Sequence, residues 1–154
     1  MTRKQVQALA LAGSVGLLLG ALAFEYIGGM APCALCIWQR WPHVFALLGA
    51  GGLLLASPVF ALIGALGAAT SGGIGVYHTG VERGWWQGPS SCSAGGNLSG
   101  LTPEELLAQI MAAPVVRCDD VAWEMLGLSM ASWNAIASFA IAGMWLASLR
   151  LARG

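Results

Sequence analysis

The stretch PCALCIWQR, residues 32–40, joins a Cys-x-x-Cys pair and a single arginine to a long apolar run. After Arg40 no charged residue appears until Glu82, and before the stretch only Glu25 interrupts an apolar segment that begins close to the N-terminus. Charged groups avoid the interior of a bilayer, so a stretch of this kind marks its edge. Two neighbouring thiols are therefore expected where a membrane meets water.

The composition of the chain is that of a membrane protein. Of its 154 residues 57% are hydrophobic and 9% are charged, and the mean hydropathy is +0.72. These values lie far from those of soluble domains. Seven acidic and seven basic residues give a formal net charge of +0, which does not indicate a nucleic-acid surface. We expect one integral membrane domain over residues 1–154.

Apolar segments of spanning length predict four transmembrane helices, since about 20 residues cross a hydrocarbon core of roughly 30 Å. The second must begin near Cys36, because a helix that began at Pro42 would be too short to cross. A cleaved signal peptide is the alternative for the first span, but its apolar run is long for one. The predicted fold is therefore an all-α membrane protein, a four-transmembrane-helix bundle. Its spans are expected at residues 6–27, 36–56, 58–78 and 129–149.

Basic residues set the predicted topology. They flank both ends of the chain, at Arg3, Lys4, Arg150 and Arg153. Since the cytoplasmic flanks of transmembrane helices carry an excess of lysine and arginine, both termini are expected in the cytoplasm. The loops over residues 28–36 and 79–128 then face the opposite, oxidising side.

The longer of these loops, residues 79–128, holds most of the chain's charge together with Cys92 and Cys118. Within it TPEE, residues 102–105, is typical of a helix start, with a threonine N-cap, a proline at the first position and a capping-box acid. The next residues, 106–111, are apolar on much of their surface. They predict a short helix that lies in the membrane interface.

Four cysteines present as pairs favour an oxidising compartment over the cytosol, and they allow three disulfide pairings that the sequence does not distinguish. Cys36 and Arg40 lie one helical turn apart, so the guanidinium and the helix N-terminus would both stabilise a Cys36 thiolate. One pair lies in a water-facing loop and the other at the lipid boundary. This arrangement predicts a redox centre that passes electrons by thiol–disulfide exchange from protein thiols into the membrane.

The residues around the two pairs form a recognisable pattern. The PCALC segment, residues 32–36, is followed by Gln39 and Arg40. Tyr77 and His78 stand at the end of the third predicted span. With the loop cysteines and four spans, this pattern resembles the DsbB family over essentially the whole chain. The resemblance implies a quinone-dependent oxidase of the bacterial inner membrane, with a periplasmic thioredoxin-fold partner of the DsbA type and with ubiquinone or menaquinone as electron acceptor.

The resemblance also implies a role for each cysteine. In the oxidised protein Cys92 would be attacked by the partner's thiolate, and Cys118 would be released as a thiol. Cys33 and Cys36 would then accept the electrons by exchange. Cys36 would face the quinone as a thiolate, and Arg40 would stabilise that anion and the charge that develops on the quinone oxygen.

Two histidines are further candidates for the quinone site. His78 could hydrogen bond to the quinone or protonate it, because imidazole exchanges protons near neutral pH. His43, which comes directly after Pro42, is the second candidate. Glu25, an acid at the membrane boundary, is interpreted as a structural hydrogen-bonding partner rather than a catalyst.

Glycines and tryptophans predict packing and anchoring. Gly16 and Gly20 form a Gly-x-x-x-Gly pair, which we interpret as a surface for the close approach of a neighbouring helix. Trp145 is interpreted as an anchor at the inner interface. The remaining tryptophans are expected at the outer interface, at positions Trp38, Trp41, Trp85, Trp86, Trp123 and Trp133.

Two alternative functions use the same cysteines. A zinc site of four thiolates is disfavoured because Cys92 and Cys118 are far apart in sequence, so no metal ligand is predicted. A membrane scaffold with structural disulfides explains the cysteine count but not Arg40 beside Cys36. The quinone, the partner (including a dedicated paralogue) and the oligomeric state are left open by the sequence.

Overall fold

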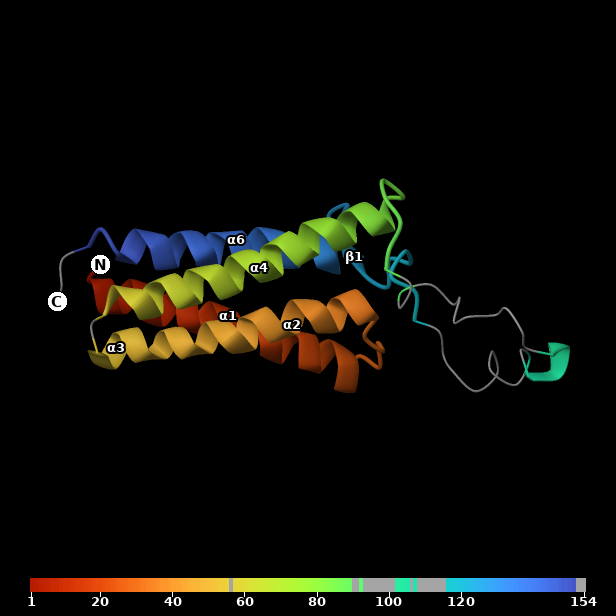
Figure 1. The fold of residues 1–154 in the computed structure, drawn as a ribbon, viewed down its shortest axis with the longest axis horizontal. Helices are drawn as coiled ribbons and strands as arrows, with labels where there is room; N and C mark the ends of the chain where they lie inside the picture. The colour runs from red at the N-terminus through yellow and green to blue at the C-terminus, as the bar shows by residue number, and fades with distance from the viewer. Residues whose placement is uncertain (56, 90–91, 93–101, 106, 108–115, 152–154) are drawn as a thin grey trace.

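The computed structural model of this protein describes residues 1–55, 57–89, 92, 102–105, 107 and 116–151 (Figure 1). Its named elements succeed one another as α1 (Arg3–Tyr26), α2 (Ala34–Ala46), η1 (Leu47–Ala50), α3 (Gly51–Leu55), α4 (Pro58–Glu82), β1 (Glu124–Met125), β2 (Leu128–Ser129) and α6 (Met130–Ser148).

The helices lie side by side as an elongated bundle (Figure 1). α4 packs against both α2 and α6, and α1 packs against α6 and α2. The beginning of α1 and the end of α6 lie at one end of the bundle, whereas the start of α2, the end of α4 and β1 lie at the other. The second end carries the cysteines, so the chemistry is expected there.

Three helices of the described part of the chain, α1, α4 and α6, are long and apolar enough to cross a membrane. The prediction of an all-α membrane protein is therefore confirmed. The predicted span over residues 36–56 is divided among α2, η1 and α3. Pro42 lacks the N–H that would bond to the preceding turn, and Gly49, Gly51 and Gly52 lower the helix propensity of the second half of the span. The count of four spans stays a prediction.

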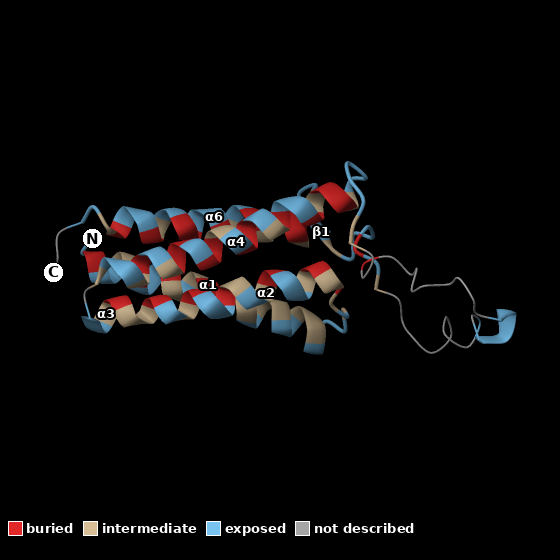
Figure 2. Ribbon diagram, in the orientation of Figure 1, coloured by how far each residue is buried: buried red, intermediate tan, exposed pale blue. Residues whose placement is uncertain are grey.

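The apolar core is centred on Trp145 of α6, and buried positions fall on the faces that the helices turn toward one another (Figure 2). A Cβ at Gly49 or Gly64 would come within 2.8 Å or 2.5 Å of the Trp145 indole. These glycines therefore form a slot that the fully buried indole fills. The prediction of Trp145 as an interfacial anchor is wrong, because the small residues opposite it admit the ring to the core.

The predicted helix start at Thr102 is confirmed. Its backbone N–H donates to Oε2 of Glu105 (2.9 Å), and the Glu105 backbone N–H donates to Oγ1 of Thr102 (3.3 Å), which is a capping box. Most of the helix expected over residues 106–111 lies outside the described residues. Its place in the membrane interface stays a prediction.

A short hairpin that the sequence analysis did not predict leads into α6. β1 pairs with β2 in antiparallel register, and both turn residues, Leu126 and Gly127, have positive φ as two-residue hairpin turns of this kind require. Ser129 then caps α6 by accepting from the Ser132 backbone N–H (3.2 Å). Its hydroxyl donates to Glu82, so the hairpin ties the start of α6 to the end of α4.

Candidate redox site

The first thiol pair is built on the start of α2. Cys33 is the N-cap residue in extended conformation, and its Sγ accepts from the Cys36 backbone N–H (3.1 Å). The helix thus begins at Ala34, slightly before the predicted start at residue 36. The two sulfurs lie 2.6 Å apart and both cysteines are free thiols. A disulfide between them needs only a small movement of the side chains.

The second pair is joined. Cys92 and Cys118 form a disulfide, and both residues are buried in a small apolar cluster with Leu35 and Val81. The Cys118 backbone N–H donates to the Cys92 carbonyl (3.3 Å). Of the three pairings that the sequence allows, the structure therefore has the loop cysteines bonded to each other, with Cys33 left as a thiol.

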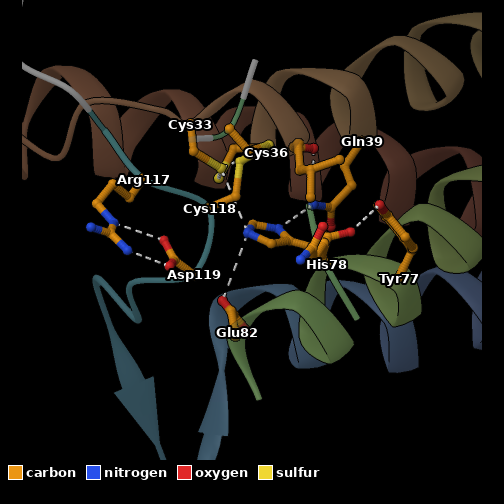
Figure 3. The surroundings of a disulfide bond; sticks show 12 residues. Cys33, Cys36, Gln39, Tyr77, His78, Glu82, Arg117, Cys118 and Asp119 are labelled. Atoms are coloured by element: carbon orange, nitrogen blue, oxygen red, sulfur yellow. Dashed lines mark hydrogen bonds and ion pairs between the residues drawn. A yellow bond between two sulfur atoms is a disulfide. The ribbon is translucent and has the colours of Figure 1, made fainter. Parts of the chain in front are cut away.

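The two pairs meet at His78. The Cys33 sulfur, the Cys118 sulfur and a His78 ring nitrogen all lie within 4.8 Å of one another (Figure 3). Thiols and an imidazole are also ligands for zinc, but Cys118 is held in a disulfide, so a metal would need that bridge to be reduced first. Neighbouring sulfurs of two different pairs are what exchange between disulfides requires.

His78 is buried on α4 at the centre of this arrangement (Figure 3). Its Nδ1 lies 2.9 Å from Nε2 of Gln39. Its Nε2 lies 3.6 Å from the Cys33 sulfur and 3.9 Å from a carboxylate oxygen of Glu82. His78, which the sequence indicated as a candidate for the quinone site, therefore lies in direct contact with the Cys33 thiol.

Cys33 lies in the loop before α2, and its protonation depends on its burial and on the neighbouring Cys36 sulfur. The hydrogen bond to the Cys36 sulfur, together with burial, holds the pKa of Cys33 well above its usual value. Cys33 therefore keeps its proton when the pair is reduced. Its S–H can then donate to Cys36, which lies closer to Arg40 in the helix.

Arg40 is bonded to a counter-ion. Its Nη1 donates to Oε2 of Glu25, and its Nη2 lies 3.5 Å from the Ala21 carbonyl. Glu25 is thus a hydrogen-bonding partner, as the sequence analysis interpreted it, and it brings a negative charge beside the guanidinium. Arg40 and Cys36 line the same cavity.

His43 lies deeper in the bundle and is 2% exposed. Its Nδ1 is 3.2 Å from the Ser14 hydroxyl and its Nε2 is 3.0 Å from the Ser138 hydroxyl. It lines the inner part of the cavity. Because both ring nitrogens already have serine partners, His43 joins α1, α2 and α6 within the bundle.

A cavity of about 410 Å³ opens between α1, α2, α4 and α6 beside the first thiol pair. It is mostly apolar, with a few polar groups in its lining, which is the usual character of a small-molecule site. Gly16 and Gly20 line it, and a Cβ at either position would meet nothing within 4 Å. Their interpretation as a helix-packing surface is wrong: they leave space open.

The loop beside the site carries an exposed ion pair. Arg117 donates from Nε to Oδ1 of Asp119 (2.9 Å). This hydrogen bond holds the pKa of Asp119 below its usual value. The two residues flank Cys118 in sequence (Figure 3).

Sequence reasoning missed several polar residues that surround His78 and His43. Asn134 donates from Nδ2 to Oε1 of Gln39 (2.7 Å), and Ser71 donates to the Gln39 carbonyl (2.8 Å). The signal that could have found them was an amide or hydroxyl inside a predicted apolar span, since such groups need partners in the bundle. Which of them meet depends on helix rotation.

The family model for disulfide bond formation protein DsbB matches residues 3–148. The chain is 32% identical over 136 residues to disulfide bond formation protein B of Shewanella sp. (strain MR-4), covering 84% of this chain and 77% of that protein. It is 33% identical over 162 residues to disulfide bond formation protein B of Verminephrobacter eiseniae (strain EF01-2), covering 99% and 88%. No solved structure matches the chain.

Proposed function

This chain belongs to the DsbB family of disulfide bond formation proteins, and from that premise we propose that it is a protein-dithiol:quinone oxidoreductase. It would reoxidise a periplasmic DsbA-type dithiol protein and pass the electrons to a membrane quinone. One observation carries the proposal: sulfurs of the two cysteine pairs, Cys33 and Cys118, lie within 4.8 Å of each other.

The first half of the reaction uses the loop disulfide. A partner thiolate attacks Cys92, the Cys92–Cys118 bond breaks, and its electron pair leaves on the Cys118 sulfur as a thiolate. That thiolate attacks Cys33 of an oxidised Cys33–Cys36 pair, so Cys36 leaves as the new thiolate. The Cys118 sulfur lies within 4.8 Å of the Cys33 sulfur, which supports Cys33 as the atom that the Cys118 thiolate attacks.

The second half restores the loop bridge. The partner's other thiol displaces Cys92 and leaves as an oxidised partner. Cys92 then attacks Cys118 and releases Cys33, so the two electrons and two protons of the partner dithiol now reside on the Cys33–Cys36 pair. A bonded Cys92–Cys118 pair beside two free thiols is the state that this stage requires.

The cavity beside Cys36 is the proposed quinone site. A quinone, when bound, accepts two electrons and two protons. The space fits a flat ring, because about 410 Å³ lies open beside Gly16 and Gly20, and Cys36 and Arg40 line it. Cys36 would present its sulfur to this space and Arg40 its positive charge, while Cys33, 2.6 Å away, is placed to close the disulfide.

From the same premise we propose that the protein lies in the bacterial inner membrane, with both termini cytoplasmic and both cysteine pairs on the periplasmic side. In this proposal α2, η1 and α3 together make the second of four crossings. The short helix that begins after Thr102 would lie on the periplasmic surface of the membrane.

Quinone reduction by the detergent-purified protein, supplied with a reduced DsbA-type partner, tests the proposal. Turnover should be lost in Cys36→Ser and in Cys92→Ser. When the oxidised wild-type protein is treated with a partner that lacks its second cysteine, the partner should stay bonded to Cys92 and a Cys33–Cys118 bridge should accumulate. Val59→Ala, an exposed change at the far end of α4, should retain full turnover. Intact disulfides that resist mild reduction, with no turnover, would instead support the structural scaffold.

A further inference from the structure

A chain of hydrogen bonds crosses the bundle and ends at the thiol pair. It begins at Ser14 on α1 and passes through both histidines and two amides. The successive heavy-atom distances from Ser14 to Cys33 are 3.2, 3.0, 3.4, 2.7, 2.9 and 3.6 Å, through His43, Ser138, Asn134, Gln39 and His78. The chemical identity of the donors and acceptors determines the direction in which each hydrogen bond of this chain is donated.

The Gln39 amide fixes the tautomer of His78. Its Nε2 donates to the Leu35 carbonyl (3.1 Å), which can only accept, so the nitrogen of the amide is the atom that faces α4. The same Nε2 lies 2.9 Å from Nδ1 of His78, which must then accept. The imidazole proton is therefore on Nε2.

The groups that face Nε2 agree with this assignment. They are the Cys33 sulfur at 3.6 Å and a carboxylate oxygen of Glu82 at 3.9 Å. The Cys33 sulfur, whose S–H is directed at Cys36, and the Glu82 carboxylate oxygen can both accept a hydrogen bond, so an N–H on this side has partners whereas a lone pair would be repelled.

Asn134 holds the Gln39 amide in place. Its Nδ2 donates to Oε1 of Gln39 (2.7 Å) and to the Ser71 hydroxyl (3.2 Å), while its Oδ1 accepts from Ser138 (3.4 Å). Because the Ser138 hydroxyl donates to Asn134, it accepts from Nε2 of His43. Both histidines thus carry the proton on the same nitrogen, and every bond in the chain donates toward Cys33.

We propose that Gln39 and Asn134 are positioning residues that keep the imidazole proton of His78 on Nε2, aimed at the Cys33 sulfur. This inference rests on the proposed function. Cys33 leaves as an anion when Cys92 closes the loop bridge, and an N–H that is already aligned stabilises that anion without reorganisation. Neither amide touches the reacting sulfurs.

The tautomers are read directly from the imidazole 15N chemical shifts of the full-length protein in bilayers, labelled at histidine. The chain has only two histidines, and His78→Gln assigns their signals by loss. Wild type should show the proton on Nε2 of His78. Finding it on Nδ1 would overturn the inference without any variant, substrate or partner.

Two isosteric variants test the positioning role. In Gln39→Glu a carboxylate faces Nδ1, so Nδ1 of His78 should become protonated. In Asn134→Asp an acceptor faces Gln39, so the Gln39 amide should turn and present its oxygen to Nδ1 of His78. Nδ1 should again become protonated, although residue 134 does not contact His78. Ser132→Ala, which removes a hydroxyl on the same helix outside the chain, should leave both histidines unchanged. An unchanged His78 signal in both amide variants would refute the positioning role.

The chemical consequence is measured in a single turnover without quinone, as the rate at which reduced partner transfers electrons to an oxidised Cys33–Cys36 pair. Both amide variants should slow this step by roughly 10- to 100-fold, the effect of losing a hydrogen bond to a charged atom. A switched tautomer with an unchanged rate would contradict the inference. A wild-type protein with the expected tautomer but no turnover would instead count against the proposed function.

Discussion

At the scale of single residues, Arg40 does not act on Cys36 as an isolated cation. Its guanidinium is bonded to Glu25, and the two side chains are 21% and 22% exposed, so water weakens their attraction. The carboxylate offsets part of the positive field at the thiol. Arg40 and Glu25 therefore affect the Cys36 thiolate in opposite directions.

Glu25→Gln keeps an oxygen for the guanidinium and removes the negative charge. We expect Cys36 to react with iodoacetamide roughly 2- to 5-fold faster at neutral pH, because an ion pair this exposed is worth at most about 1 kcal/mol. Arg40→Ala should slow the reaction and should impair quinone reduction more than exchange at Cys92. The rates are measured by mass spectrometry with a Cys33→Ser background.

Glu105→Gln is the matched control, since it removes an exposed acid from the loop and should leave the alkylation rate at Cys36 unchanged. Equal alkylation rates at Cys36 in Glu25→Gln and Arg40→Ala would contradict the expectation that Glu25 and Arg40 affect the Cys36 thiolate in opposite directions. Equal loss of quinone reduction and of exchange at Cys92 in Arg40→Ala would contradict its assignment to the quinone step.

Residue types and spacing were enough to find the cysteines, Arg40 and Glu25 as candidates. They were not enough to find what each side chain bonds to. Gln39 and Asn134 are far apart in the chain and meet only because α2 and α6 turn particular faces inward. A pattern within one helix does not specify the rotation of its neighbour. The hydrogen bonds from Asn134 through Gln39 to His78 could therefore not be predicted from the sequence.

At the scale of elements, α1 differs from its prediction in what its glycines do. Gly16 and Gly20 lie one turn apart on a face that borders the cavity, and no heavy atom lies within 4 Å of a Cβ built at either position. A glycine pair permits either a close helix or an open space, and sequence does not distinguish the two. Here the open space lies beside the thiols.

Gly20→Leu should fill this space with a branched side chain. We expect the KM for quinone to rise about 10-fold or more, equivalent to about 1.4 kcal/mol of lost binding, while exchange between the partner and Cys92 is unchanged. The two steps are measured separately, by quinone reduction and by a quinone-free single turnover.

Gly143→Leu is the matched control for this prediction. Gly143 lies on an exposed face of α6 where a Cβ also meets nothing within 4 Å, so the gain in helix propensity is the same. If Gly143→Leu raised the KM as much as Gly20→Leu, the effect would belong to the bundle in general and not to the cavity.

The segment from α2 to α3 shows a second limit of element prediction. Its apolar length predicts one helix, yet Pro42 and the glycines after it divide the segment into three pieces. Hydropathy records how long a segment is, whereas continuity depends on backbone hydrogen bonds that proline and glycine weaken.

At the scale of the whole molecule, composition was sufficient for the fold class because few folds satisfy an apolar chain in lipid. The placement of the packed core at one end of the bundle and of the candidate site at the other could not be predicted from the sequence. One end is packed around the fully buried Trp145 indole, while the other holds the thiols, the cavity and most polar contacts. The tightly packed end fixes the helices that position Cys33 and His78 at the other.

The number of crossings is the last prediction, and it rests on the arrangement of the ends. α1 begins and α6 ends at the same end of the bundle (Figure 1), which requires an even number of crossings. Since α1, α4 and α6 are long and apolar enough to make three, we predict that the segment formed by α2, η1 and α3 makes the fourth. Reporter fusions after residue 57 and at both termini should be cytoplasmic, and fusions after residues 29 and 104 periplasmic. A periplasmic signal at residue 57, with the termini on opposite sides, would instead require three crossings and would place Cys92 and Cys118 in the cytoplasm, away from a periplasmic partner.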